Sequence, residues 1–206
     1  MWKRGFYDIR YDFFAFIGRN RLKFLVALVL AAGGFIFGLI NALVRVSTDD
    51  ALAAVQNYDI IRLSLGARTF FGYWMGRLFL HLLLIAVISV LGVRELLAYL
   101  FYAVIAIYAY QYAFFIGAVF CYAGLTVLPL MLLCIIPFFL LFLCILAYYG
   151  VFIICFSHRS GIGQWREFSY YVQCVKFPFL WALAAVFCAS LIESALATLL
   201  TAGIVL

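Results

Sequence analysis

The chain has 206 residues, of which 70% are hydrophobic and only 11% are charged, and its formal net charge is +6. Soluble proteins carry about 25% charged residues, so this composition excludes a soluble enzyme or a soluble binding domain. Because the basic residues lie beside apolar segments, no nucleic-acid partner is expected. The composition predicts one domain, an all-α polytopic transmembrane helical bundle of about five spans, with membrane lipids as partners.

Residues 1–21 place apolar side chains at helical intervals with charged residues between them. This pattern is typical of an interfacial amphipathic helix that lies in the headgroup plane. Residues 22–43 form the first predicted span, with Gly34 and Gly38 at GxxxG spacing. Small residues let helices approach closely in lipid, so we expect these glycines to pack against another helix, either of this chain or of a second copy in a homo-oligomer.

The longest hydrophilic stretch, residues 44–76, is expected to connect the first two spans. Ser47 and Asp50 have the spacing of a helix cap, and apolar residues follow at helical intervals, which predicts a surface helix. The aromatic residues at 70–74 are typical of a membrane interface. A long connection in a protein with few other loops is the best candidate for a partner-binding surface.

Residues 78–93 form a short second span with His81, and residues 96–120 form a third span that is rich in tyrosine. Phenol and amide groups in hydrocarbon need hydrogen-bonding partners, so the polar face of the third span should turn inwards. That face carries Tyr108, Gln111 and Tyr112. Two uses stay open for these groups: hydrogen bonds between helices, or a path for a solute.

Residues 125–156 would measure about 48 Å as one helix, more than the roughly 30 Å of a bilayer core. We expect a broken helix at Pro129 and Pro137, either within one tilted fourth span or with a re-entrant hairpin that adds a sixth crossing. Residues 157–177 are predicted as a polar loop, and residues 178–206 as the last span.

Ten of the 14 Lys and Arg residues fall on one side of the five-span arrangement. They lie in the N-terminal arm, at Arg94 and in the loop 157–177, whereas Arg77 belongs to the smaller group on the other side. The positive-inside rule then places the N-terminus and the loop 157–177 in the cytoplasm, and the connection 44–76 and the C-terminus outside.

Glu193 is the one acidic residue deep in a predicted span. An uncompensated carboxylate at mid-membrane costs about 2.5–3.5 kcal/mol, so it should face protein, be protonated or pair. The candidate partners are His81, Arg77, Arg94, Ser190 and the tyrosine face of the third span. Two interpretations stay open, a structural hydrogen bond inside the bundle and a proton or cation site.

The sequence carries no motif of a catalytic centre. It has no glycine-rich phosphate loop, no paired carboxylates and no local nucleophile motif, and its six cysteines lack metal-ligand spacing. We therefore expect a protein without enzymatic activity, catalytic residues, bound metal or cofactor.

Several short motifs occur in order along the chain. They are a basic arm, the Gly-rich stretch 33–38, the region of Gly117 where the third span ends, the segment 128–137 with its two prolines, and the tripeptide 191–193. In this combination the chain resembles the stage II sporulation protein M family of bacterial membrane proteins. Members of that family tend to have polar residues just after the first proline, whereas this chain has Leu130 and Met131.

The resemblance implies a non-enzymatic scaffold or anchor that assembles partner proteins, among them cell-wall proteins, at the bacterial cytoplasmic membrane. A different class of function is a permease subunit, of ABC type with a separate ATPase subunit or a secondary transporter, that moves a small solute, peptide or ion. It would use the third span, the proline-broken segment and Glu193. A third alternative is a small immunity or membrane-stress protein.

Overall fold

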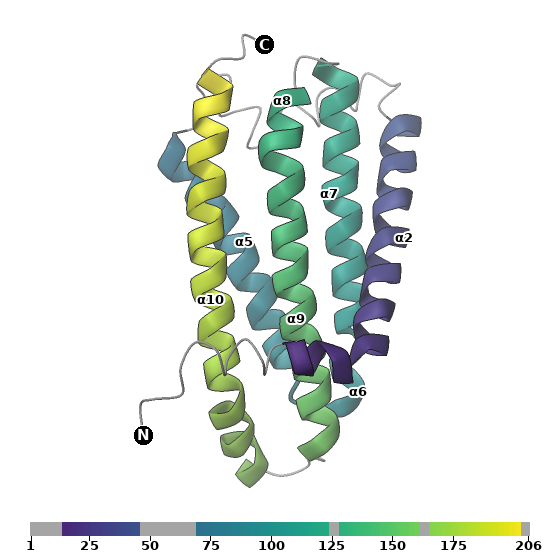
Figure 1. Cartoon of the computed structure of the whole chain (residues 1–206), viewed down its shortest axis with the longest axis vertical. Helices are drawn as coiled ribbons and strands as arrows, with labels where there is room; N and C mark the ends of the chain where they lie inside the picture. Colours follow the sequence, from purple (N-terminus) through teal and green to yellow (C-terminus); the bar gives the residue numbers. More distant parts are fainter. Residues whose placement is uncertain (1–13, 46–68, 124–127, 161–164, 203–206) are drawn as a thin grey trace.

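The computed structural model describes residues 14–45, 69–123, 128–160 and 165–202, and within these ranges every regular element is a helix (Figure 1). Five of the helices are long and apolar enough to cross a membrane: Arg21–Arg45, Phe70–Leu91, Glu95–Cys121, Met131–Ser157 and Tyr171–Leu200. The chain is a multi-pass membrane protein with an all-α fold, which confirms the prediction from composition.

The bundle is built around one central helix. Its elements are α2 (Arg21–Arg45), α5 (Phe70–Leu91), α6 (Glu95–Ala98), α7 (Phe101–Ala123), α8 (Leu128–Leu130), the π-helix η2 (Met131–Ile135), α9 (Ile136–Ser160) and α10 (Trp165–Ala202). Helix α9 packs on α2, α5, α7 and α10, and its side chains Phe142, Leu146 and Ile153 are buried. In Figure 1, α10, α9, α7 and α2 stand in a row, and α5 crosses behind α10 and α9.

Helix α2 packs mainly on α7, through its glycines. A Cβ atom at Gly34 would collide with the carbonyl oxygen of Ala106, and one at Gly38 with the carbonyl oxygen of Tyr110. The two backbones can approach this closely only because both positions lack a side chain. The glycine pair therefore serves helix packing, as its spacing predicts, and its partner belongs to the same chain.

The prolines of the fourth span do not break it. The elements α8, η2 and α9 follow one another without a gap from Leu128 to Ser160. Proline lacks an N–H and crowds the carbonyl four residues before it, and a π turn with its wider ring is one local adjustment to such a disturbance. Here the N–H of Ile136, just before Pro137, donates to the carbonyl of Met131. The expected break at Pro129 and Pro137 is thus a single π turn, and this segment makes one crossing.

The second span begins earlier than its charge pattern predicts. Thr69 caps α5 by accepting a hydrogen bond from the Gly72 N–H at 3.2 Å, so residues 70–76 belong to the helix and not to the connection. Tyr73 in this first part is buried and faces the core instead of a membrane interface. The predicted surface helix falls on residues 46–68, outside the described residues.

The last helix also begins earlier than predicted. Helix α10 has 38 residues, and residues 165–177, predicted as loop, form its first turns. A helix of this length measures about 57 Å, so it extends beyond the bilayer core at its charged end. Pro178 lies inside the helix, where we expected the span to start. Membrane helices tolerate such a proline, because neighbouring groups can satisfy the freed carbonyl.

The N-terminal arm is described only from residue 14, and residues 1–13 lie outside the described part. Residues 14–19 are helical and lie across the bundle near the end of α9 (Figure 1). Phe16 packs on Tyr148 and Phe152 of α9, with ring centroids 5.5 and 6.0 Å away. That the whole arm lies in the headgroup plane stays a prediction.

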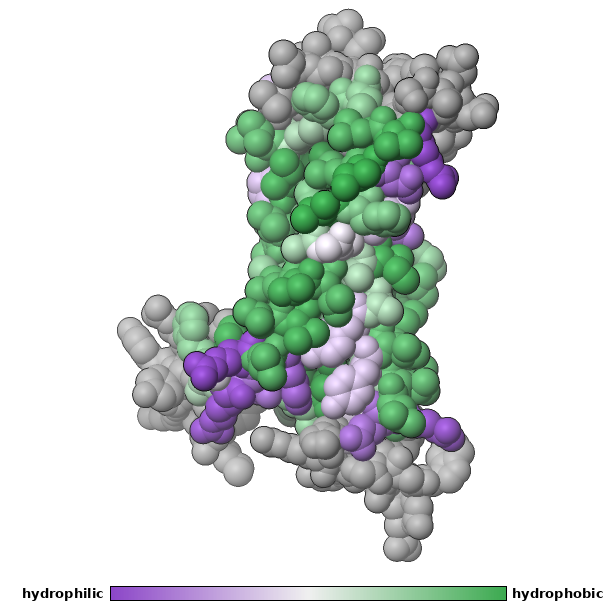
Figure 2. Space-filling view, turned by 90° about the vertical axis from the view of Figure 1, so that its right-hand side faces the viewer, coloured by the Kyte–Doolittle hydropathy of each residue, from purple (hydrophilic) through white to green (hydrophobic). Residues whose placement is uncertain are grey.

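The outer surface matches a lipid environment. Large apolar side chains such as Phe37, Phe79 and Trp181 are more than half exposed. Figure 2 shows hydrophobic residues along the middle of one face and hydrophilic ones towards both ends. Because this outward surface is apolar, the groups that could carry chemistry within the described spans must be sought inside the bundle.

Candidate functional site

A buried ion pair joins α5 to α10. The Arg77 guanidinium donates from Nη2 to Oε1 of Glu193 at 2.5 Å, and from Nε to Oε1 and Oε2 at 3.1 and 3.3 Å. The Glu193 side chain is only 1% exposed and that of Arg77 17%. With two nitrogens of the fork engaged, the carboxylate has the charge-assisted hydrogen bonds that an ionised group needs in a low-dielectric interior.

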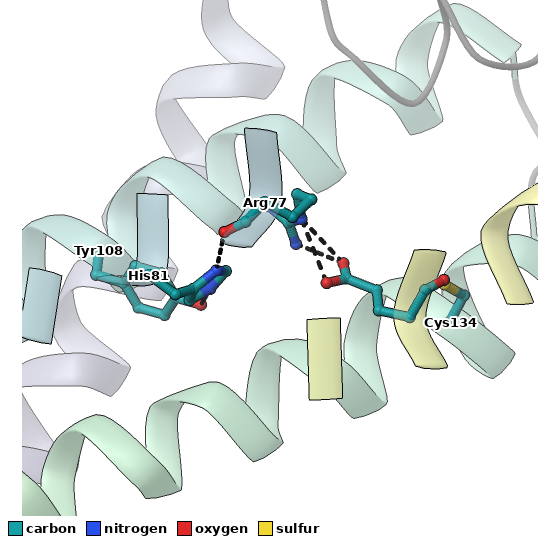
Figure 3. A network of polar contacts seen from close by, with 5 residues as sticks. Arg77, His81, Tyr108 and Cys134 are labelled. Carbon is teal, nitrogen blue, oxygen red and sulfur yellow. Dashed lines mark hydrogen bonds and ion pairs between the residues drawn. The ribbon is translucent and has the colours of Figure 1, made fainter. Parts of the chain in front are cut away.

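His81 continues this network one turn further along α5. Its Nδ1 lies 2.7 Å from the carbonyl oxygen of Arg77, and its Nε2 lies 3.0 Å from the hydroxyl of Tyr108 on α7 (Figure 3). A carbonyl oxygen can only accept, so Nδ1 carries a hydrogen atom and donates it. In the neutral imidazole, Nε2 then accepts from the Tyr108 hydroxyl. The histidine is fixed from both sides and serves to join α5 to α7.

Aromatic rings enclose these polar groups. The Arg77 guanidinium carbon lies 4.8 Å from the ring centroid of Tyr112, within the range of a cation–π contact. The His81 ring stacks on Phe142 of α9 with centroids 3.7 Å apart. Phe139 of α9 stacks on both Tyr108 and Tyr112, at 5.9 and 4.9 Å. We call the set Arg77, His81, Tyr108, Tyr112 and Glu193 the polar centre.

The polar centre borders the π turn. Cys134 in η2 donates its thiol hydrogen to the backbone carbonyl oxygen of Glu193 at 3.5 Å. Two buried hydroxyls, that of Tyr112 in the polar centre and that of Ser194 next to Glu193, have no hydrogen-bond partner among the described residues. The centre therefore combines a satisfied ion pair with a small unused capacity for hydrogen bonding.

The structure brings together four of the five residues predicted for an intramembrane polar site: Glu193, His81, Tyr108 and Tyr112. Gln111, the fifth, is exposed on α7, so its predicted inward orientation is wrong. The reason is helical geometry, because residue 111 lies about 100° around the helix from residue 112 and cannot share its inward direction. Of the partners considered for Glu193, Arg77 is the one that binds it.

The other candidate partners lie elsewhere. Ser190 is buried but donates to the carbonyl oxygen of Phe187 at 3.0 Å, within its own helix. Arg94 is exposed beyond the far end of α5. His81 is held by Arg77 and Tyr108 and does not contact the carboxylate through a described hydrogen bond.

Arg77 was expected as a possible partner of Glu193 but, because it was placed at the outer end of a span, not as a member of the intramembrane polar site. A usable signal exists, because Tyr73, Arg77 and His81 follow one another at four-residue intervals and so share one helix face. Asn41 was also missed, although it donates to the Tyr110 hydroxyl and links α2 to α7. Both residues are polar groups inside spans, which bury themselves against a partner helix.

The polar centre consists of an ion pair, whose two charges neutralise each other, surrounded by aromatic rings. Within the described ranges no three of His, Cys, Asp or Glu lie close enough together to hold a metal ion. The carboxylate of Glu193 and the guanidinium of Arg77 bind each other, which links α5 to α10. His81 and Tyr108 link α5 to α7 in the same way. None of the protein families, curated proteins or solved structures compared with the chain matches it.

Proposed function

We propose that this protein is a non-enzymatic membrane scaffold that holds partner proteins at the bacterial cytoplasmic membrane. One observation carries the proposal: the buried ion pair inside the described spans joins two helices to each other. Arg77 and Glu193 engage each other, and His81 is held by Arg77 and Tyr108. A bundle whose buried polar groups bind one another between helices favours an anchor over a transporter.

The resemblance to the stage II sporulation protein M family supports the same role. In that reading the partners are other membrane proteins or cell-wall proteins, and the connection 44–76 is the surface that recruits them. The glycine face of α2 packs on α7, so it does not serve as a surface for a partner protein. Partner binding through the connection stays a prediction, since most of it lies outside the described residues.

The proposed orientation has the N-terminus in the cytoplasm and the C-terminus outside. Among the described residues, the exposed cations Arg19 and Arg21 at the start of α2 and Arg94 after α5 gather at one end of the bundle. Arg45 lies at the other end, where α2 finishes. Basic residues near the ends of spans favour the cytoplasmic side, which supports this orientation.

A charge-free variant tests the scaffold proposal. Replacing a buried ion pair by apolar residues of similar volume is often neutral or stabilising, so Arg77→Met combined with Glu193→Leu should leave the bundle intact. Tagged wild type and double variant, each expressed in place of the native protein, are purified in mild detergent and their co-purifying proteins are quantified. We expect the same partner at near-equal amounts with both.

The control is an unrelated multi-pass protein carrying the same tag. The scaffold proposal fails if wild type retains no protein beyond this control. It also fails if the double variant folds, as shown by its elution volume and helix content, but loses the partner.

A second candidate function, a permease subunit, is favoured by one observation. The π turn Met131–Ile135 lies against the backbone of Glu193, and the hydroxyls of Tyr112 and Ser194 have no partner among the described residues. Isolated π turns are frequent at functional sites in membrane helices and elsewhere. An opening of the Arg77–Glu193 pair would expose a charged site between α5 and α10.

Flux through proteoliposomes separates the two functions. For a permease, wild type should carry protons or a small solute, and the Arg77→Met, Glu193→Leu double variant should lose this flux while remaining folded. For a scaffold, neither protein should conduct above empty liposomes. Flux that is equal in both proteins would exclude the polar centre as its route.

A further inference from the structure

A lysine and a cysteine that are far apart in the sequence meet at the end of the bundle where α2 begins. The Lys23 ammonium donates from Nζ to Sγ of Cys155 at 3.2 Å, across a separation of 132 positions. The Cys155 thiol in turn donates to Oδ1 of Asn20 at 2.9 Å. Both hydrogen bonds direct the sulfur lone pairs towards the lysine nitrogen.

This contact is held in place by its surroundings. Asn20 donates from Nδ2 to the carbonyl oxygen of Phe16 at 3.0 Å, and Phe16 packs on the ring of Phe152 of α9. The backbone of Lys23 accepts from the Tyr102 hydroxyl of α7 at 3.4 Å. Three helices and the N-terminal segment therefore converge on the lysine and the cysteine.

The exposure of the pair suits a reaction with a small apolar oxidant. Lys23 and Cys155 are both intermediate in burial, so they are shielded from large reagents but are not sealed off. Dioxygen is apolar and dissolves in hydrocarbon, which brings it to this level of a membrane. Cys134 differs, because it is fully buried and its thiol donates to a backbone carbonyl oxygen.

We propose that Lys23 and Cys155 form a reversible covalent bridge in which one oxygen atom links Nζ to Sγ. The reactants are a thiol, an alkylammonium ion and one molecule of dioxygen. The S–H bond, two N–H bonds and the O–O bond break, while an N–O and an O–S bond form. The second oxygen atom leaves as water and one proton is released. Four electrons pass from sulfur and nitrogen to dioxygen, so the step is balanced.

The bridge would tie the start of α2 to α9. Within the described residues α2 packs mainly on α7, so an additional covalent joint would fix the N-terminal end of the bundle in oxidising conditions. A cross-link between distant residues restricts the unfolded chain and raises the stability of the folded one. Reduction by a dithiol would restore the free amine and thiol. This inference is independent of the proposed scaffold role.

Mass spectrometry of the full-length protein tests the proposal. Wild type is purified in detergent with air-saturated buffer, and one half is then treated with dithiothreitol before digestion. We expect a joined pair of peptides containing Lys23 and Cys155, heavier than their sum by one oxygen atom less two hydrogen atoms. The pair should disappear after dithiothreitol, and the thermal unfolding midpoint should be higher in the air-exposed half.

Three variants complete the test. Lys23→Arg keeps the cation and Cys155→Ser keeps the size, and both should abolish the joined peptides. Cys174→Ser is the matched control, since Cys174 has the same intermediate burial, and should leave them unchanged. The proposal is overturned if air-exposed wild type contains no joined pair, if Cys155 appears only as a sulfur acid, or if the joined pair survives dithiothreitol.

Discussion

Gly34→Leu is expected to lower the free energy of unfolding by about 3 kcal/mol, at the upper end of the cost of overpacking. A Cβ atom at this position would meet the backbone carbonyl of Ala106, and a backbone cannot turn aside as a flexible side chain can. The helices must then move apart, and α2 has most of its packing on α7. Gly38→Leu should act in the same way, against the carbonyl of Tyr110.

The neighbouring glycine provides a matched control. Gly33 has no atom within 4 Å of an added Cβ, so Gly33→Leu adds an apolar side chain to the lipid-facing surface. Its stability should stay within about 0.5 kcal/mol of wild type. The measurement is loss of helix content during titration of detergent-solubilised protein with dodecyl sulfate. Equal midpoints for Gly33→Leu and Gly34→Leu would contradict the close approach of α2 to α7.

Glu193→Gln is expected to destabilise the bundle by about 3–5 kcal/mol, the usual cost of removing one partner of a buried ion pair. The substitution keeps the size of the side chain but leaves the Arg77 guanidinium without its counter-charge. Arg77→Met should cost a similar amount, because it strands the carboxylate of Glu193. The loss should come from α5 and α10 separating near the polar centre, where the two helices meet.

A double-mutant cycle distinguishes pairing from two independent losses. If the two residues stabilise the fold through each other, Arg77→Met combined with Glu193→Leu should recover most of the stability that either single change removes. Arg94→Met, at an exposed cation outside the spans, should have little effect and serves as the control. Additive losses in the double variant would show that Arg77 and Glu193 do not depend on each other.

The number of spans and the packing role of the glycines follow from local sequence alone. The number of spans depends on apolar runs, because a segment that crosses the lipid core must be apolar over about 20 residues. Gly34 and Gly38 are four positions apart, which places them on one helix face. The partner of those glycines was not predicted, although the third span carries small residues at four-residue intervals, Ala109, Ala113 and Gly117. In the structure Gly38 faces Ala113 and Gly117 faces Ala42. Which helix meets which is decided by the packing of the whole bundle.

Most members of the polar centre were predictable from the sequence, but the position of Arg77 inside the membrane was not. A carboxylate inside a span must find a partner, so the prediction that Glu193 pairs follows from solvation energy alone. Its partner Arg77 lies seven positions after the start of α5, whereas charge counting placed it at the outer end of the second span. The count of Lys and Arg assumes that each basic residue lies at a membrane interface. Arg77 instead pairs with Glu193 inside the bundle, so it carries no information about orientation.

The same limit applies at the ends of the helices. The polar residues 165–177 and Pro178 suggested a loop, yet they form the first turns of α10. A helix that emerges from the bilayer is free to carry charges, so a change in polarity marks the edge of the membrane and not the end of the helix. The contact of Lys23 with Cys155 had no local signal either, since it joins positions 132 apart in the sequence.

The pairing of Arg77 with Glu193 imposes an order on biogenesis. Helix α5 leaves the ribosome long before α10, the last of the five, so its guanidinium enters the bilayer with no carboxylate yet available. Until α10 has been synthesised, that segment must be sheltered by the insertion machinery or lie displaced towards the lipid surface. Its final depth is set only when α10 arrives, so the insertion of α10 also fixes the position of a helix that was made much earlier.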